Sequence, residues 1–518
     1  MRCAVTACAF LLAVAAAACG GDDTAAPGSA AGDALAYLPK DAGVVVLVST
    51  DFEDEQWQRF DRQIFRTFGQ GSLENTLEEA VEGEGSVSYE DDVKPLLGND
   101  VVLGTLGEAG DLTGDDDGEN GDGFVGALEV TDGDEAESAL EKGGFERTGE
   151  ESGAVLYRND EGEVAAVEGD VVVVAQDRET LVHALTIRDD GEGLTEDDLD
   201  EKLVDLPEDV LVRAFGDLEN LGGIEQLARF RNVPWVAAVR SFGLTVSLPE
   251  DDALNLDAAV VTDPDALEEE DLPLASGEAA PEVVTREDEI SGANRDQSRT
   301  TVFLLRALRA GYPDSRFVRA VDKIEEELGI DFEREILRQF DGPSASYVSA
   351  DGSVFAARSE IRDPDALRTV LPRIAPHLPA LIEGLQGLQS EGMALLFLFA
   401  PDAPAAAPLQ GVSVDPPATE DGFYRVSGLT GDGPSELYFN VVGDVFVVAS
   451  DEQRAREIAA ADTVAVEGAR GAGVLRADLT ELDRGQGFVF LPIVARELVA
   501  SVEASVERLR VRVRVAFE

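Results

Sequence analysis

The feature that most constrains the fold is an internal repeat, because the order of sequence elements in the first half of the chain recurs in the second half. The clearest pair is residues 169–177, whose pattern returns in residues 443–451. Both stretches place Gly-Asp before an apolar run and end at an aspartate that can cap a following helix. A chain with two such copies is expected to form two related domains.

Other segments match in the same order, and each pair shares its element type and its place along the copy. The pairs are the strand ending at Val48 with the strand near Ile290, the helix with Trp57 and Phe60 with the helix holding Phe303 and Leu304, 93–98 with 336–342, 124–130 with 354–360, the helix near Ala136 with the helix near Ala366, 217–218 with 478–479, and 254–261 with 509–517. The spacing changes where surface loops are expected to differ. Acidic loops 111–123 and 189–201 belong to the first copy only, and a segment around 385–420, with an expected buried strand at 393–400, belongs to the second.

The pattern within each copy predicts an α+β domain, in which helices pack on a mixed and mainly antiparallel sheet. Gly-Asp pairs between apolar runs favour antiparallel hairpins. The regular alternation of strand and helix that signals a parallel sheet is absent. We therefore predict a tandem duplication with copy 1 at 35–263 and copy 2 at 288–518, joined by an acidic linker at 264–287.

The N-terminus has the order of parts found in a secretory signal. Arg2 precedes an apolar run, and small residues lead to Cys19, after which the chain turns polar. We predict a signal peptide at 1–18, lipidation of Cys19 with fatty acyl chains such as palmitate, and a flexible tether at 19–34. This places the protein on the extracytoplasmic face of a bacterial cell membrane, attached through the lipid. An ordinary signal peptide with an incidental cysteine is the alternative.

Four features together resemble a family of bacterial lipoproteins known only as a domain of unknown function. They are the opening at residues 38–41, Gly98 before a strand, the Gly-Asp hairpin with its apolar run, and the cysteine after the small residues. The resemblance extends over nearly the whole chain after the signal. It implies an envelope location and a duplicated body. Its motifs are turns and strands, so it supplies no catalytic residue.

The charge balance excludes some partners. The formal net charge is −64, which repels nucleic-acid backbones and leaves the lipid as the expected membrane contact. Hydrophobic residues make up 44% of the chain, enough for packed cores. The three cysteines are Cys3, Cys8 and Cys19, so the mature chain offers no disulfide, and no later segment reaches the length of a membrane span.

The side chains of common catalytic centres are scarce. Zinc catalysis needs three ligands, yet only His183, His377 and the blocked cysteine remain, and we expect both histidines to be solvated or structural. The sequence has no Gly-x-Ser-x-Gly string, no Ser-x-x-Lys pair and no phosphate-binding loop ending in Gly-Lys-Ser/Thr. We assign no catalytic residue and no cofactor. The aromatic side chains of Trp57, Phe60, Phe65 and Phe68, and Trp235, are expected to be buried.

Acidic residues leave two alternatives open. The chain holds 105 of them, so paired carboxylates of the kind a glycosidase needs occur by chance. Residues 115–122 gather oxygen ligands, of which Asp115, Asp117, Glu119 and Asp122 are weak calcium candidates, although the spacing of an EF-hand is missing.

Three functions follow from these observations. The leading hypothesis is a non-enzymatic module that binds a protein or small-molecule ligand in the cleft between the copies. The alternatives are an envelope hydrolase acting through paired carboxylates and cation binding through the acidic loops. A groove lined by apolar and aromatic side chains would favour binding, and a buried acid pair would favour hydrolysis.

Overall fold

The computed structural model describes most of the chain after the first thirty residues. The described residues are 31–68, 78, 81, 87–106, 123–218, 229–285, 289–349, 351–390, 411–419, 421–429, 434–480 and 495–517. Within them the protein is a mixed α+β structure, as the sequence predicts. None of the helices in these ranges combines enough length and apolar character to cross a membrane.

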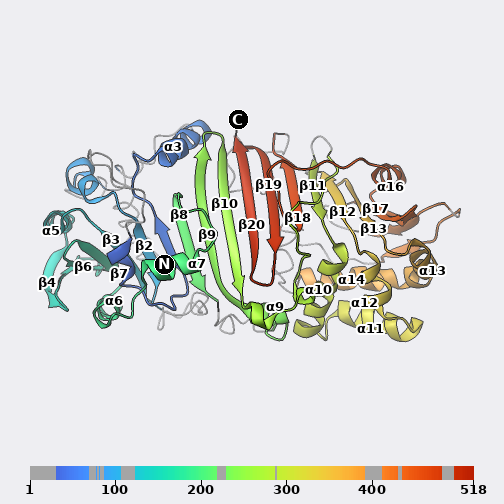
Figure 1. Ribbon diagram of the computed structural model, residues 1–518, viewed down its shortest axis with the longest axis horizontal. Helices are drawn as coiled ribbons and strands as arrows, with labels where there is room; N and C mark the ends of the chain where they lie inside the picture. Colours follow the sequence, from blue (N-terminus) through green and yellow to red (C-terminus); the bar gives the residue numbers. More distant parts are fainter. Residues whose placement is uncertain are drawn as a thin grey trace.

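The described strands join into one sheet of twenty strands that runs across the whole molecule (Figure 1). Every pairing between neighbouring strands is antiparallel. From the outer edge to the centre, the first half contributes β4 (Glu146–Glu151), β5 (Ala154–Arg158), β6 (Val164–Glu168), β7 (Val171–Ala175), β3 (Phe124–Glu129), β2 (Val101–Thr105), β1 (Val45–Val48), β8 (Val212–Asp217), β9 (Val239–Glu250) and β10 (Ala253–Thr262).

The second half continues the sheet from the centre to the other edge. Its strands are β20 (Arg508–Phe517), β19 (Ala495–Ala504), β18 (Gly473–Asp478), β11 (Glu289–Asn294), β12 (Ser344–Ser349), β13 (Phe355–Glu360), β17 (Val445–Ala449), β16 (Glu436–Val442), β15 (Tyr424–Ser427) and β14 (Ser413–Asp415). Read outward from the centre, the two halves therefore place their strands in the same order along the chain. Descent of both halves from one ancestor stays a prediction.

The predicted Gly-Asp hairpins are confirmed in both halves. Gly169 begins the turn between β6 and β7 with a φ of +60°, and Gly443 holds the same place between β16 and β17 with a φ of +61°. Glycine adopts this left-handed conformation without the clash that a Cβ atom causes. Each hairpin then leads into a helix that an aspartate caps, Asp177 in the first half and Asp451 in the second.

Helices lie on both faces of the sheet in each half. Those of the first half, with the segment that follows β10, are α2 (Gly32–Leu35), α3 (Glu55–Phe68), the π-helical turn η1 (Tyr89–Val93), η2 (Lys94–Leu96), α5 (Gly133–Lys142), α6 (Arg178–Asp190), α7 (Glu196–Lys202), α9 (Pro234–Ala238), η5 (Pro264–Ala266) and η6 (Glu269–Asp271). Those of the second half are α10 (Gln297–Gly311), α11 (Arg316–Leu328), α12 (Phe332–Glu335), η7 (Leu337–Gln339), α13 (Pro364–Ile374), η8 (Ala375–His377), α14 (Leu378–Ser390) and α16 (Glu452–Ala459).

Each half has two hydrophobic cores, one on each face of its sheet. In the first half, α5 and η1 pack on one face, and α2 and α6 pack on the other. In the second half, α11, α13 and α14 cover one face, and α16 covers the other. The arrangement is three layers, with the sheet in the middle.

The halves meet along a seam, which is the paired strands β10 and β20. Nine residue pairs join these strands, from Ala253 opposite Ala516 to Val261 opposite Arg508. A second contact lies beside the seam, where Trp235 of α9 packs edge-on against Phe303 of α10 with ring centroids 6.3 Å apart. The two halves thus share both a sheet and a side-chain contact.

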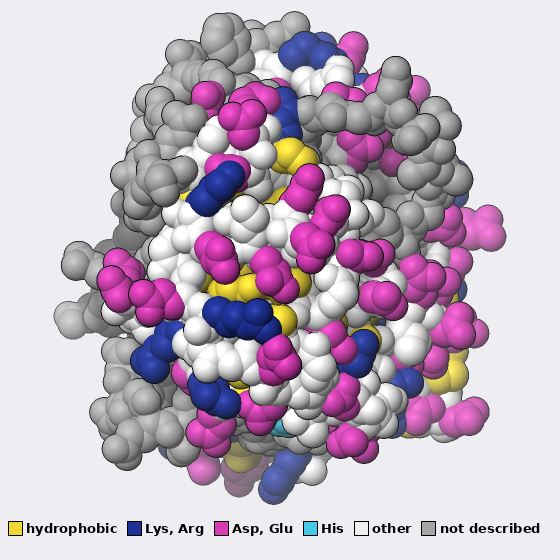
Figure 2. Space-filling view, turned by 90° about the vertical axis from the view of Figure 1, so that its left-hand side faces the viewer, with side chains coloured by type: hydrophobic (Ala, Val, Ile, Leu, Met, Phe, Trp, Pro, Cys, Tyr) yellow, Lys and Arg dark blue, Asp and Glu magenta, His cyan; other side chains and the backbone are white. Residues whose placement is uncertain are grey.

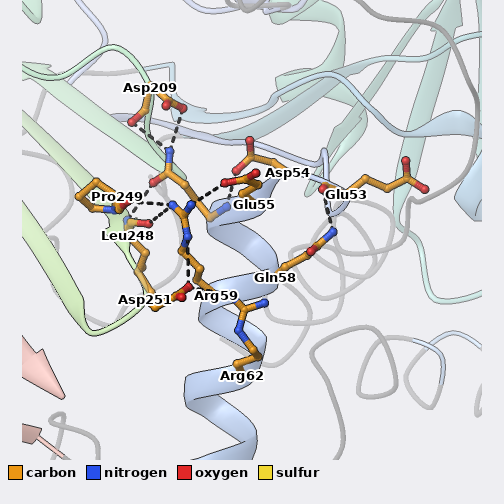
Figure 3. Close-up of polar contacts among 11 residues, drawn as sticks. Glu53, Asp54, Glu55, Gln58, Arg59, Arg62, Asp209, Leu248, Pro249 and Asp251 are labelled. Atoms are coloured by element: carbon orange, nitrogen blue, oxygen red, sulfur yellow. Dashed lines mark hydrogen bonds and ion pairs between the residues drawn. The ribbon is translucent and has the colours of Figure 1, made fainter. Parts of the chain in front are cut away.

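Helix α3 is fixed to the end of the β9–β10 hairpin by bonds to its backbone (Figure 3). The amide of Gln56 donates to the carboxylate of Asp209 at 2.8 Å and accepts from the backbone N–H of Leu248 at 2.8 Å. Arg59 donates to the carbonyl oxygens of Leu248 and Pro249 at 3.0 and 2.9 Å. The helix therefore sets the position of the hairpin end, which borders the site described below.

Two sequence expectations differ from the structure, and a third concerns residues outside the described ranges. Residues 189–201 are not an acidic loop, because α6 extends to Asp190 and α7 begins at Glu196, where Thr195 and Asp198 form a capping box. Ala31 and Ala34, expected in the tether, are fully buried around α2. The expected strand at 393–400 lies outside the described residues.

Candidate binding site

The predicted site residues fall into two groups. Cys19 and the calcium candidates lie outside the described residues, the latter being Asp115, Asp117, Glu119 and Asp122. Both histidines are described. His183 is exposed on α6, at the rim of an open hollow of about 790 Å³. His377 lies in η8, with its Nδ1 3.6 Å from a carboxylate oxygen of Glu327.

The described residues bring no metal centre together. Within those ranges, no group of three or more His, Cys, Asp or Glu side chains is placed to hold an ion. The structure has a concave site over the seam, where the two halves join. We call this site the trough, and define it by the residues that line it.

The trough lies over the seam and encloses about 550 Å³. It is lined by residues of β10, β18, β19 and β20 and by one loop, namely Asn255, Asp257, Val464, Ala465, Val466, Glu467, Gly468, Arg476, Glu497, Val499, Ser501, Arg512, Val513 and Arg514. Eight of these fourteen residues are charged or polar and none is aromatic, whereas the binding hypothesis expected an apolar and aromatic lining. The site is therefore built on four neighbouring strands of one sheet and on the loop 464–468, and not in a gap between separate domains.

Strand β20 supplies the basic side chains through simple alternation. Successive residues of a strand point to opposite faces, so Arg508, Arg510, Arg512 and Arg514 share one face, and the apolar residues between them share the other. We call these four residues the arginine row. The row lies on the face that α6 covers in the first half and α16 covers in the second, as the register from β20 to Phe215 and Ala293 shows.

All four members of the arginine row contact carboxylates of the first half. The contacts are Arg508 with Asp205, Arg510 with Asp257 at 3.0 Å, Arg512 with Asp257 at 3.3 Å, and Arg514 with Glu250 at 2.9 Å. Asp257 is 8% exposed and takes two guanidinium groups from the opposite strand. Charge complementarity thus fixes the register of the two halves at the seam.

A row of directly paired residues crosses the seam, and three of its members, Ser501, Arg512 and Asp257, line the trough. Ser501, Arg512, Asp257 and Thr245 lie opposite one another across β19, β20, β10 and β9. Ser501 and Thr245 are 7% and 1% exposed, although both are polar. Polar side chains buried at this depth are usually held by hydrogen bonds or lie beside a ligand or water.

A second row brings two accessible arginines to the floor of the trough. Arg476 of β18, Val499 of β19 and Arg514 of β20 are paired in sequence across the three strands. The side chains of Arg476 and Arg514 are 38% and 47% exposed. Two guanidinium groups therefore flank a small apolar residue on the floor.

Two of the three carboxylates that line the trough accept hydrogen bonds from arginines. Asp257 accepts from Arg510, and Glu497 accepts from Nε of Arg476 at 2.6 Å. Burial raises the pKa of Asp54, Asp100 and Glu129, but none of these three lines the trough. Asp257 and Glu497 are therefore held in ion pairs with arginine.

The trough differs in charge from the end of the molecule that carries β4. Figure 2 shows acidic side chains spread over the end of the molecule that carries β4, with basic ones scattered among them. In the lining of the trough, by contrast, Arg476, Arg512 and Arg514 balance Asp257, Glu467 and Glu497. A chain with a net charge of −64 thus holds a locally neutral site rich in hydrogen-bond donors.

Sequence reasoning missed the arginine row, although a signal was present. From Arg508 the sequence alternates basic and apolar residues through Val515, which is the pattern of a strand with one charged face. The partners of that face could not be read from it, because the pairing of β10 with β20 joins residues about 250 positions apart. No sequence pattern indicated that Arg476 of the second half lines the trough.

Comparisons with known proteins give a family and no activity. No curated protein matches the chain. Two solved structures of TP0453 are similar: crystal form IV has 8% identity and a TM-score of 0.25 over 44% of this chain and 79% of that one, and crystal form III has 10% and 0.25 over 46% and 80%. The sequence model of a family described as "Protein of unknown function (DUF3352)" matches residues 3–268, which end just after the seam strand β10. The chain belongs to this DUF3352 family of proteins of unknown function.

Proposed function

We propose that the protein is a non-enzymatic binding module of the bacterial cell envelope, anchored by a lipid on Cys19, which holds a ligand in the trough. The observation that carries the proposal is the trough itself. It offers about 550 Å³ over the seam, with arginine, serine and asparagine side chains in its lining. A concave site with a few convergent polar groups is the usual form of a ligand site.

The placement of the trough supports a role in binding. Both halves contribute to it, since Asn255 and Asp257 come from β10 and the remaining lining residues come from the second half. We propose that the halves are tandem copies whose joining created the site. Two carboxylates of its lining, Asp257 and Glu497, are engaged by arginines, which supports a site that holds a ligand without transforming it.

The ligand is tested by releasing it from the protein. The full chain, purified from the cells that produce it, is examined by native mass spectrometry before and after mild denaturation. We expect a bound small molecule in the wild-type protein and its loss in Val499→Trp, because the new indole fills the floor of the trough. Leu385→Trp is the matched control, since Leu385 is an exposed apolar residue on α14. Equal occupancy in both variants would contradict the assignment of the trough.

The anchor is tested separately by intact-mass analysis. The wild-type protein from membrane extracts is expected to begin at Cys19 and to carry the mass of a diacylglycerol and a further acyl chain. The Cys19→Ala variant is expected to lack that mass and to leave the membrane fraction. A wild-type mass without lipid would overturn the proposed localisation and leave the trough hypothesis intact.

A further inference from the structure

The proposed ligand can be assigned a chemical class from the floor of the trough. We infer that it carries an oxyanion, a carboxylate or a phosphate, which binds between the guanidinium groups of Arg476 and Arg514 above Val499. This inference rests on the proposed function and adds the recognition chemistry. The two arginines are brought together by strand pairing alone, since they lie on β18 and β20 with one strand between them.

The spacing of the two arginines suits a bound anion. Neighbouring strands lie about 4.8 Å apart, so the Cα atoms of Arg476 and Arg514 are separated by roughly 10 Å. Directly paired residues point to the same face, and Val499 between them has a short side chain. Two long guanidinium arms over a short residue leave a gap into which a carboxylate or phosphate group fits.

The four arginines around the floor, Arg476, Arg510, Arg512 and Arg514, differ in how many of their donors are taken up by carboxylates. Arg512 bonds two carboxylates, Glu503 through Nη1 at 2.8 Å and Asp257 through Nε at 3.3 Å, and its side chain is 29% exposed. Arg510 is 16% exposed and donates to Asp257. Both are therefore held at the seam, with little surface left for a ligand.

Arg476 and Arg514 keep donors outside their ion pairs. Glu497 accepts from Nε of Arg476, so the two terminal amino groups of that guanidinium take no part in this bond. Arg514 reaches Glu250 through Nη2, and both of these side chains are about half exposed. An exposed ion pair of this kind contributes little, so a ligand oxyanion can take over the guanidinium at small cost.

The alternative ligand class, a cation, has less support from the floor. The carboxylates that would attract it, Asp257 and Glu497, already accept from arginines at 3.0 and 2.6 Å. No group of three acidic or other ligating side chains is placed for a metal ion in the described residues. The donors that remain accessible at the floor are those of guanidinium groups, which pair with carboxylate and phosphate in a fork geometry.

The experiment measures oxyanion binding by the full chain with isothermal titration calorimetry, using inorganic phosphate and succinate as probes. We expect wild-type protein to bind at least one probe, and Arg476→Gln and Arg514→Gln each to weaken it by about tenfold or more, as the loss of one charge-assisted contact requires. Arg425→Gln is the matched control, because Arg425 of β15 is similarly exposed, at 46%, and is paired with Asp415 of β14. Its affinity is expected to equal that of wild type.

The two probes also separate the possible sources of the oxyanion. Preference for phosphate identifies a phosphate-bearing ligand, and preference for succinate identifies a carboxylate. Far-ultraviolet circular dichroism of each variant checks that the fold is retained, and Arg476→Lys, which keeps the charge, is expected to recover part of the affinity. Binding of neither probe at millimolar concentrations, or equal binding by all variants, would overturn the inference.

Failure of the inference is distinguishable from failure of the proposed function. If native mass spectrometry finds a neutral ligand that Val499→Trp removes and the two Arg→Gln variants retain, the trough binds a ligand and the oxyanion assignment is wrong. If the wild-type protein binds the probes but Val499→Trp binds them equally, the oxyanion lies elsewhere and the inference fails. The proposed function fails only if native mass spectrometry also finds equal ligand occupancy in Val499→Trp and Leu385→Trp.

Discussion

At the scale of the residue, Asp257 of the first half contacts two arginines of the second half, Arg510 and Arg512. It is 8% exposed and accepts from Arg510, with Arg512 at 3.3 Å. Removing the charge from Asp257 leaves two guanidinium groups without their shared partner in a shielded place. A broken ion pair of this kind is strongly destabilising, because an uncompensated charge remains.

We therefore expect Asp257→Asn to lower the free energy of unfolding by about 2–3 kcal/mol, measured by urea denaturation. The value is below that of a fully buried pair because Arg512 also has Glu503. Asp415→Asn is the control, since Asp415 and Arg425 pair on the surface and an exposed pair of this kind contributes little to stability. Equal losses in the two variants would show that the seam ion pairs contribute no more than surface ones.

A second prediction concerns the hairpin between β12 and β13. Hydrogen bonds from the Ser349 and Ser353 hydroxyls and from the Ser353 backbone N–H lower the pKa of Asp351 from 3.8 to about 2. The folded-state pKa is lowered, so the stability that these bonds add is present above pH 3.8 and is lost as the pH falls to about 2. Carboxyl NMR titration should give a midpoint near 2, and Ser353→Ala should raise it. A midpoint at the ordinary value would show that the turn is not formed in solution.

At the scale of the element, the Gly-Asp hairpins give matched predictions in the two halves. A Cβ atom at Gly169 or Gly443 would meet nothing within 4 Å, so a substitution costs only backbone strain at φ near +60°. We expect Gly169→Ala and Gly443→Ala each to lower the free energy of unfolding by about 1 kcal/mol, and the Asn variants to lose less. Gly149→Ala, on the edge strand β4 without a positive φ, serves as the control in the same thermal unfolding measurement. A similar loss at Gly149 would contradict the strain argument.

Elements fixed by local chemistry could be predicted from the sequence. The capped helices after Asp177 and Asp451, the hairpins before them, and the antiparallel character of the sheet all depend on residues a few positions apart. Helix α7 was not predicted, although its signal is also local. Its acidic run suggested a loop, although the Thr195 to Asp198 capping box was a helix signal.

The site could be predicted only in part, because it depends on pairing between distant segments. The sequence hypothesis placed a cleft between the halves, and the trough lies over the seam where they join. The sequence did not reveal that β10 and β20 pair, nor that Arg476 and Arg514 lie on either side of Val499. Strand register over hundreds of residues is set by the packing of the whole sheet, so a local pattern does not contain it.

At the scale of the whole molecule, the net charge of −64 opposes the compact state through self-repulsion, and the seam holds the halves together against it. Repulsion between exposed charges is screened by salt, whereas the shielded pairs around Asp257 are screened much less. We therefore expect the midpoint of thermal unfolding to rise as ionic strength increases from about 10 mM to about 0.15 M, since the Debye length then falls from about 30 Å to about 8 Å.

The Asp257→Asn variant separates the contribution of the seam ion pairs from that of overall repulsion when its thermal unfolding is followed by calorimetry. It should unfold at a lower temperature than wild type at every salt concentration, yet gain as much from added salt, because the repulsion it carries is nearly unchanged. Sodium chloride is used so that anions with strong exclusion effects do not contribute. A midpoint that falls with salt in the wild-type protein would mean that exposed ion pairs, rather than overall repulsion, govern the stability of this acidic chain.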